Sequence, residues 1–467
     1  MRSTTADTVA ADRAEGFVSN RLAAGWGIGS MATATMLNAP TAMLLYVLVT
    51  LIKLDPFVVG TLIFAGKMLD VVTDPPIGAL SDRTRTGIGR RRPWLLGSSF
   101  ACGISFALLF NVPALGPTAS YIYVGCALAV FAIAYTSFQV PYMAMPAEMT
   151  DDYHQRTKIM SWRVVFMSAG NLLGAAGYGA VAKILGGEQA SRASYGEAAI
   201  YFGIFITLVM LATFFFTSRT RQTAAASGQD DIPMRQHIQW LFENRPLVIL
   251  VSTKIAIYVG VFSALTTAMF FFTRILKLDE SSFFMVMGVQ MVTTILFMPV
   301  CNWLSKRIGK KPAYILSLGG FCVLSVSWLL AGPNEPVPLL MTRAVLLGMF
   351  GAGAHLYGQS MLIDTFALDH RLTGQRREGV LSASFSFVEK ACMALGPFIV
   401  GTLLSVLGFD RELATKADQS ASAVLAIQIG YIGIPVFCNL VSITLLKFYH
   451  LTEADLIPVR NTESRQR

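Results

Sequence analysis

The sequence predicts an all-α membrane protein whose twelve helices cross the bilayer. Of its 467 residues, 54% are hydrophobic and only 14% are Asp, Glu, Lys or Arg, whereas about 25% of a soluble domain is charged. The mean hydropathy is +0.56. So few charges cannot cover a water-exposed surface, and lipid must therefore contact most of the exterior.

The twelve spans are predicted from apolar runs of about 20 residues, the length that crosses a bilayer. A polar stretch, residues 219–246, separates six spans from the other six. We predict an N-terminal six-helix bundle (1–218), a cytoplasmic central loop (219–246), and a C-terminal six-helix bundle with a cytoplasmic tail (247–467). The runs begin near residues 22, 56, 93, 119, 159, 197, 247, 280, 312, 335, 380 and 421.

The positive charges predict the orientation. If both termini are cytoplasmic, the inner tails and loops contain 25 of the 37 Lys and Arg residues and the outer loops contain 7. Basic residues prefer the cytoplasmic side, so we expect a multi-pass protein of a bacterial-type inner membrane. The first twenty residues are polar and include acids, which argues against a cleavable signal there. The basic residues form no stripe interleaved with aromatics, so no nucleic-acid partner is expected.

The two halves resemble each other. GALSDRTRTGIGRRRPWLLG follows span two and NWLSKRIGKKPAYILS follows span eight; both are short and basic, with Gly before Pro. PAEMTDDYHQRTKIMSW after span four corresponds to IDTFALDHRLTGQRREGVLSAS after span ten. Any inner loop tends to be basic, so each similarity alone is weak evidence. Together they predict two pseudo-symmetric bundles, an arrangement typical of rocker-type transporters.

Span two contains three charged residues where lipid would otherwise be. Lys67, Asp70 and Asp74 lie in FAGKMLDVVTDPPIGAL, and spacings of three and four place them on one helix face. Each ionised group at membrane depth costs at least about 2.5 kcal/mol, so it needs a partner or water. Two such carboxylates can share Na+ or a proton, which predicts a coupling-ion site. Alternatively, Lys67 and the aspartates neutralise each other to hold helices together. Pro75 and Pro76 permit a helix break nearby.

Span eleven supplies two adjacent charges, Glu389 and Lys390, in SFSFVEKACMALGPF. Because two buried carboxylates repel each other, Lys390 is the expected counter-charge to Asp70 and Asp74. A purely structural salt bridge is the alternative. We group Lys67, Glu389 and Lys390 into one coupling network.

Candidate solute ligands occur in spans one, four and five. Tyr135, Thr136 and Gln139 share one face of span four, where hydroxyl and amide groups could bind the ion or a solute. Arg163, near the inner end of span five, could clamp an oxygen-rich solute or cap a helix end. Asn38 in span one could bind solute or join two helices.

The remaining polar residues suggest no other chemistry. Lys254 and Arg343, near the ends of spans seven and ten, can extend their charges to the membrane interface, so they rank low as site residues. The six cysteines lie in apolar segments without a CxxC pair, which predicts small buried hydrophobes and no metal site. HExxH, GxSxG and nucleotide-binding fingerprints are absent from the sequence, so we predict no enzyme activity and no cofactor besides the coupling ion.

Two segments carry a resemblance to a known family. DVVTDPPIGALSDRTRTGIGRRRPW resembles the span-two signature of the glycoside, pentoside and hexuronide:cation symporters: an Asp, three residues, Asp-Pro, and a basic loop ending in Pro-Trp. IDTFALDHRLTGQRREGVLSASFSFVEKACMALGPF is similar to the family's passage into span eleven. The resemblance covers essentially the whole chain. It implies the major facilitator fold and cotransport of a solute with Na+ or H+ by alternating access.

The resemblance also implies roles for single residues. Asp70 and Asp74 match the family's cation-binding aspartates, and Lys390 matches its span-eleven lysine. Lys67 matches a basic residue one turn earlier in span two. Thr136 falls on a hydroxyl position near the cation site.

The solute positions match less completely. Tyr135 and Arg163 fall on positions that line the sugar site in the family. A galactoside-binding member has acids in spans one and four, where this chain has Ala34 and Gln139, so galactoside recognition is not expected. Fewer acids near the ion site also favour H+ over Na+. The family includes carriers of hexuronides, of non-carbohydrate solutes and, in animals, of lysophospholipids.

The basic inner loops are expected to act as a conformational latch when the carrier faces outward, although they could serve only as topology signals. The residues concerned are Arg90, Arg91, Arg92, Lys310 and Lys311, with the acids Asp82, Glu148 and Asp364, and with Arg376 and Arg377.

Taken together, these features predict a monomeric symporter that couples H+ or Na+ to a glycoside, pentoside, hexuronide or related small organic solute. Its partners are that solute, a monovalent cation and the lipid bilayer. The alternatives are a carrier of a non-sugar solute, such as an organic acid, lysolipid or drug-like molecule, and a membrane sensor that transports nothing.

Overall fold

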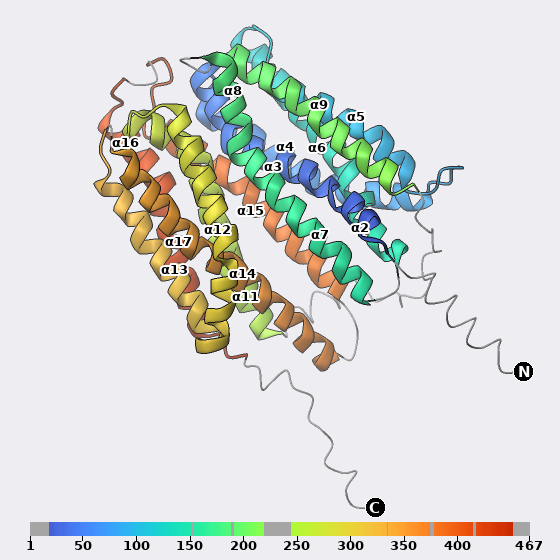
Figure 1. Ribbon diagram of the computed structural model, residues 1–467. Coiled ribbons are helices and arrows are strands. Elements are labelled where there is room, and N and C mark those ends of the chain that lie inside the picture. The colour runs from blue at the N-terminus through green and yellow to red at the C-terminus, as the bar shows by residue number, and fades with distance from the viewer. Residues whose placement is uncertain are drawn as a thin grey trace, which may run out of the picture.

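The computed structural model describes residues 18–150, 153–187, 191–218, 244–333, 335–373, 378–413 and 417–451. Within these ranges, twelve helical segments are long and apolar enough to cross a membrane. The prediction of an all-α protein with twelve spans is therefore confirmed (Figure 1). Each predicted start lies within two helical turns of the observed one.

Six spans precede residue 219. They are formed by α2 (Asn20–Gly27) with α3 (Gly29–Tyr46) and η1 (Val47–Leu51), α4 (Pro56–Arg83), α5 (Arg92–Phe110), α6 (Pro117–Met149), α7 (Tyr153–Leu172) with η2 (Leu173–Gly177) and α8 (Tyr178–Gly186), and α9 (Arg192–Phe216).

Six spans follow residue 243. They are formed by α11 (Arg245–Phe270) with η3 (Phe271–Ile275), α12 (Glu280–Ile308), α13 (Lys310–Val326) with η4 (Ser327–Leu330), α14 (Val337–Thr373), α15 (Glu378–Val406), and α16 (Ala421–Gln428) with η5 (Ile429–Gly433) and α17 (Ile434–Lys447). Below, "outer end" means the end of the molecule at residues 52–55, following the predicted orientation.

Local capping chemistry fixes several helix starts. Asp55 accepts hydrogen bonds from the backbone amides of Phe57 and Val58, and Pro56 occupies the first turn of α4. Ser191 forms a capping box at the start of α9. Side-chain oxygens of this kind satisfy amides that have no partner within the helix, so the short polar connections set where these spans begin.

The two prolines of α4 do not interrupt it. Pro75 and Pro76 lie inside a helix that runs from Pro56 to Arg83, so the break that the sequence permitted is absent. Each proline removes one backbone donor, but the helical path continues on both sides. As a result, Asp70 and Asp74 stay one turn apart on a regular helix.

The two halves pack closely where α4 meets α15 and where α3 meets α11. In Figure 1, α15 lies in the middle of the molecule, between the N-terminal and the other C-terminal helices. Thr266 of α11 donates a hydrogen bond to the carbonyl of Thr41 in α3 at 3.2 Å. Toward the outer end, a Cβ on Gly60 would lie 2.8 Å from the carbonyl oxygen of Pro397. Glycine thus lets α4 and α15 approach closely there.

Gly401→Ala is expected to shift the protein toward a state that is open at the outer end. A Cβ on Gly401 would collide with the carbonyl of Pro56 in the opposite half, and overpacking of this kind costs about 1–3 kcal/mol. In a background without the exposed Cys126, a membrane-impermeant thiol reagent added outside should modify Thr41→Cys about tenfold faster when Gly401→Ala is present.

Gly319→Ala is the matched control for this prediction, because no atom lies within 4 Å of a Cβ at that position in α13. Equal modification rates in the Gly401 and Gly319 variants would show that close packing of α4 against α15 does not hold the outer end closed.

Candidate cation and solute site

Three helices bring four polar side chains together at the junction of the halves. Thr136 of α6 lies with its hydroxyl oxygen 2.5 Å from Asp70 Oδ1 and 3.1 Å from Asp74 Oδ1. Lys390 of α15 donates to Asp74 Oδ2 at 2.6 Å and lies 3.5 Å from Asp70 Oδ2. The structure thus groups the predicted cation ligands with the predicted counter-charge.

The hydroxyl of Thr136 has fewer protons than the two contacts require. A threonine hydroxyl carries one proton, yet its oxygen lies within hydrogen-bond distance of both Asp70 and Asp74. Two ionised carboxylates would leave one of these oxygen contacts repulsive. An added proton on one carboxyl or a small cation among the three oxygens resolves the conflict, so the geometry is suited to binding H+ or Na+.

The two carboxylates differ in exposure. The side chain of Asp70 is 3% exposed, that of Asp74 is 31% exposed, and that of Lys390 is 17% exposed. Asp74 is therefore the more accessible carboxylate of the two, whereas Asp70 is enclosed by protein. Because Asp74 belongs to the N-terminal half and Lys390 to the C-terminal half, their ion pair joins the two halves directly.

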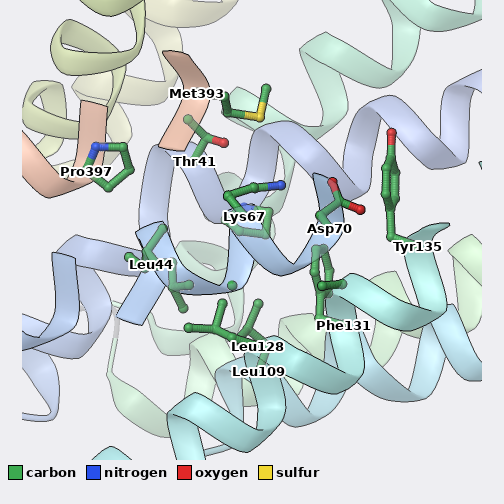
Figure 2. A pocket seen from close by; sticks show the side chains of 14 residues that line it. Thr41, Leu44, Lys67, Asp70, Leu109, Leu128, Phe131, Tyr135, Met393 and Pro397 are labelled. Atoms are coloured by element: carbon green, nitrogen blue, oxygen red, sulfur yellow. The ribbon is translucent and has the colours of Figure 1, made fainter. Parts of the chain in front are cut away.

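Lys67 lies beside this cluster, in a small apolar cavity lined mainly by α3, α4, α6 and α15. Figure 2 shows Lys67 and Asp70 on one helix and Tyr135 on its neighbour. The Lys67 ammonium lies 6.0 Å from the ring centre of Tyr135, and the Lys390 ammonium lies 5.9 Å from the same centre. The space open to the centre of a water molecule is about 20 Å³, enough for roughly one water. Lys67 can thus compensate charge in the cluster without pairing directly with a carboxylate.

Thr136→Val is expected to weaken cation coupling. The change keeps the side-chain volume but removes the hydroxyl that contacts both aspartates. Hydrogen bonds to charged groups contribute about 1.5–3 kcal/mol, so the cation concentration for half-maximal solute uptake should rise about tenfold. Thr136→Ser, which keeps the hydroxyl, should behave like the wild type. An unchanged cation requirement in Thr136→Val would remove this residue from the cation site.

The predicted solute ligands occupy two different environments. Gln139 Oε1 and Arg163 Nε are buried without a hydrogen-bond partner in the described structure, which is uncommon for buried polar groups. Asn38 instead donates to Asn171 Oδ1 at 2.9 Å, so in this state it connects α3 to α7. Tyr135 is buried and faces the cation cluster.

Glu389 is next to Lys390 in the sequence but has different neighbours. Its carboxylate interacts electrostatically with Lys254 of α11 and Arg163 of α7. It is therefore not part of the aspartate cluster, although the charge network that we predicted included it.

Four of the predicted latch residues form ion pairs within their own half. Arg91 contacts Asp82 at 3.0 Å, and Lys310 contacts Asp364 at 2.7 Å. Arg92 donates to the carbonyl of Phe214. To act as a latch between the halves, these residues would have to form ion pairs with the opposite half in another conformational state. Arg376 and Arg377, and the side chain of Glu148, lie outside the described residues.

The sequence reasoning missed several buried charges, and Lys254 and Glu280 are two of them. Lys254 does not extend to an interface, because it is only 2% exposed and lies inside the C-terminal half. Glu280, at the outer end of α12, accepts hydrogen bonds from Tyr46 at 3.2 Å and Tyr195 at 3.3 Å. Both tyrosines belong to the N-terminal half, so Glu280 bridges the halves at the outer end. In the sequence, Glu280 is visible only as an acid at the start of a span. Such an acid looks the same as one that faces water at the start of a helix.

Known proteins align with almost the whole chain. The inner membrane symporter YicJ of Escherichia coli (strain K12) is 26% identical, with 92% of each chain covered. The putative glycoside/cation symporter YagG of the same organism is 25% identical, again with 92% of each covered. The sphingosine-1-phosphate transporter MFSD2B of Mus musculus is 25% identical and covers 93% of this chain and 90% of its own length.

Solved transporter structures share the fold. A bacterial homologue of the lysosomal transporter Spinster superposes with a TM-score of 0.67 at 13% identity, covering 93% of this chain and 97% of that chain. The nucleoside transporter NupG gives a TM-score of 0.61 at 11% identity, covering 91% and 99%. The predicted major facilitator fold is thereby confirmed. The family model described as MFS/sugar transport protein matches residues 25–453, and the chain belongs to that family.

Proposed function

We propose that this protein is a secondary active transporter that moves a small organic solute together with H+ or Na+ by alternating access. The observation that carries the proposal is the contact of one Thr136 hydroxyl with two carboxylates that are also paired to a lysine of the opposite half. Such a cluster changes its bonding when a cation arrives, and the change reaches both halves.

The cation acts on the ion pair that joins the halves. Lys390 donates to Asp74 at 2.6 Å, and this attraction depends on the negative charge of Asp74. When H+ or Na+ neutralises Asp74, the bond to Lys390 weakens and α15 can move relative to α4. Solute bound between the halves then stabilises the closed intermediate, and the carrier reopens on the other side.

The present arrangement corresponds to the inward-facing state of this cycle. Glu280, Gly60 and Gly401 hold the halves together toward the outer end, whereas the inner ion pairs of Asp82 and Asp364 are satisfied within their own halves. In the outward-facing state, the inner basic residues would exchange these partners for acids of the other half and act as the latch.

The solute class favoured here is a hydroxylated molecule, such as a glycoside, pentoside or hexuronide. Tyr135, Gln139 and Arg163 offer hydroxyl, amide and guanidinium groups, which suit sugar oxygens, and YagG is named a glycoside/cation symporter. A lipid-like solute is the second candidate, because MFSD2B is named a sphingosine-1-phosphate transporter. The name of YicJ supports an inner-membrane location.

Uptake into proteoliposomes tests the proposal. Radiolabelled glycosides, pentoses, hexuronates, organic acids and lysolipids are added under an imposed Na+ gradient, an imposed proton gradient, or neither. Accumulation of one class that requires one of the gradients supports symport and identifies both solute and ion. Gradient-independent equilibration of a solute would indicate a facilitator, and binding without flux would indicate a sensor.

A further inference from the structure

The C-terminal half contains a second group of buried polar side chains that lack partners. The hydroxyls of Tyr258 and Tyr314 are buried without a hydrogen-bond partner in the described structure. Lys254, only 2% exposed, places its ammonium 5.5 Å from the ring centre of Tyr258. Leaving a buried polar group without a hydrogen bond is unfavourable, so such a cluster requires an explanation beyond packing.

A glycine of α14 makes room for the Lys254 ammonium inside the C-terminal half. A Cβ on Gly358 of α14 would collide with the Lys254 ammonium and lie 2.7 Å from the Tyr314 hydroxyl. The glycine therefore creates the space into which the ammonium fits. His355, one turn earlier on α14, also interacts electrostatically with Lys254. These contacts fix the position of a positive charge inside the bundle.

Glu389 connects this cluster to the N-terminal half. It lies beside Tyr258, with which it interacts, although the contact does not meet hydrogen-bond geometry, and its charge interacts with both Lys254 and Arg163. Arg163 belongs to α7 in the N-terminal half, and its Nε is buried without a partner. Glu389 thus interacts with Tyr258 of its own half and with Arg163 of the other half, and each of these two residues has a buried polar atom without a hydrogen-bond partner.

We propose that Glu389 and Tyr258 form the C-terminal wall of the solute site, opposite Arg163, and that Lys254 is a positioning residue that attracts and orients the Glu389 carboxyl group. This inference rests on the proposed function and names contact residues for it. Glu389 accepts hydrogen bonds from solute hydroxyls, and the Tyr258 hydroxyl donates to a solute oxygen. The solute then satisfies groups of both halves at once, which draws the halves together.

Thiol labelling tests the position of Glu389 without any solute. Glu389→Cys, in a background without Cys126, is exposed in inside-out vesicles to 2-sulfonatoethyl methanethiosulfonate or its trimethylammonium analogue. With Lys254 and Arg163 left in place, the anionic reagent should react about tenfold faster than the cationic one. Lys254→Gln should reduce that ratio several-fold, and Arg163→Gln provides a second variant if Lys254→Gln does not fold.

Phe387→Cys is the matched control. It lies two residues earlier on α15, about 200° around the helix, and Phe387 is 55% exposed, so we expect it to face lipid and to react with neither reagent. An unreactive Glu389→Cys would overturn the proposal, because Glu389 would then not reach the aqueous pathway. A reagent ratio that neither Lys254→Gln nor Arg163→Gln changes would also overturn it.

Transport provides a second readout that separates the proposed roles. With the solute identified in the proteoliposome screen, Glu389→Gln and Tyr258→Phe should raise KM at least tenfold while the cation requirement stays normal, and Glu389→Asp should recover part of the affinity. Lys254→Gln should change KM only while Glu389 is present. The KM of the double variant Lys254→Gln/Glu389→Gln should therefore equal that of Glu389→Gln alone. A normal KM in Glu389→Gln overturns the proposal.

If the wild-type protein moves no solute of the screen, the proposed function fails, and the labelling result still decides whether Glu389 lines the pathway.

Discussion

Asp74→Asn is expected to abolish uphill solute accumulation while exchange of solute across the membrane continues. The amide keeps the volume of the side chain and can still accept a hydrogen bond from Lys390, whose distance to Asp74 is 2.6 Å. It can neither take up a proton nor carry the charge that attracts Na+. One cation crossing 100 mV supplies about 2.3 kcal/mol, roughly a fiftyfold solute gradient, and this gradient should disappear.

Asp418→Asn is the control for that experiment. Asp418 also pairs with a lysine, Lys277, but its side chain is 87% exposed, and exposed pairs contribute about 0–1 kcal/mol. Accumulation and solute–solute exchange are measured in the same proteoliposomes. Full accumulation by Asp74→Asn would mean that the cation binds elsewhere.

Lys390→Met is expected to destabilise the protein strongly, and adding Asp74→Asn should reverse most of the loss. Lys390 contacts Asp74 at 2.6 Å and Asp70 at 3.5 Å, so without it two carboxylates remain close together with no direct counter-charge. Removing one partner of a buried ion pair costs about 3–5 kcal/mol. The double variant again has equal numbers of positive and negative charges in the cluster, with Lys67 opposite Asp70.

Thermal unfolding in detergent measures this effect. The midpoint should fall in Lys390→Met and recover in Lys390→Met/Asp74→Asn, although neither variant should accumulate solute. Equal losses in the single and double variants would show that Lys390 contributes by packing, not by compensating the charge of the aspartates.

The part of the site that could be predicted from the sequence depends on a strong energetic constraint. A charge at membrane depth must have a partner, so Asp70 and Asp74 on one face of span two required a cation such as Lys390. The hydroxyl of Thr136 could be added because it lay on the same face of span four as Tyr135 and Gln139. Lipid enforces the twelve spans in the same way, since an apolar run of that length has few alternatives.

The parts that the sequence could not predict depend on contacts between distant segments. Lys254 lies close enough to the end of a span to reach water, and only the position of Gly358 in another helix shows that it is enclosed. Glu280 resembles a helix-start acid until Tyr46 and Tyr195 are placed against it. The effect of Pro75 and Pro76 was overestimated, because a missing donor does not break a helix whose neighbours hold it in place.

The most direct test of the central claim is the electrical current that follows a rapid solute jump on proteoliposomes adsorbed to a solid-supported membrane. We predict that the solute from the uptake screen produces a transient positive current in the wild-type protein, because the cation enters with it. Asp70→Asn, which removes the charge of the most enclosed carboxylate of the cluster, should bind the solute and give no current. The same current in wild type and Asp70→Asn would contradict cation coupling at this site.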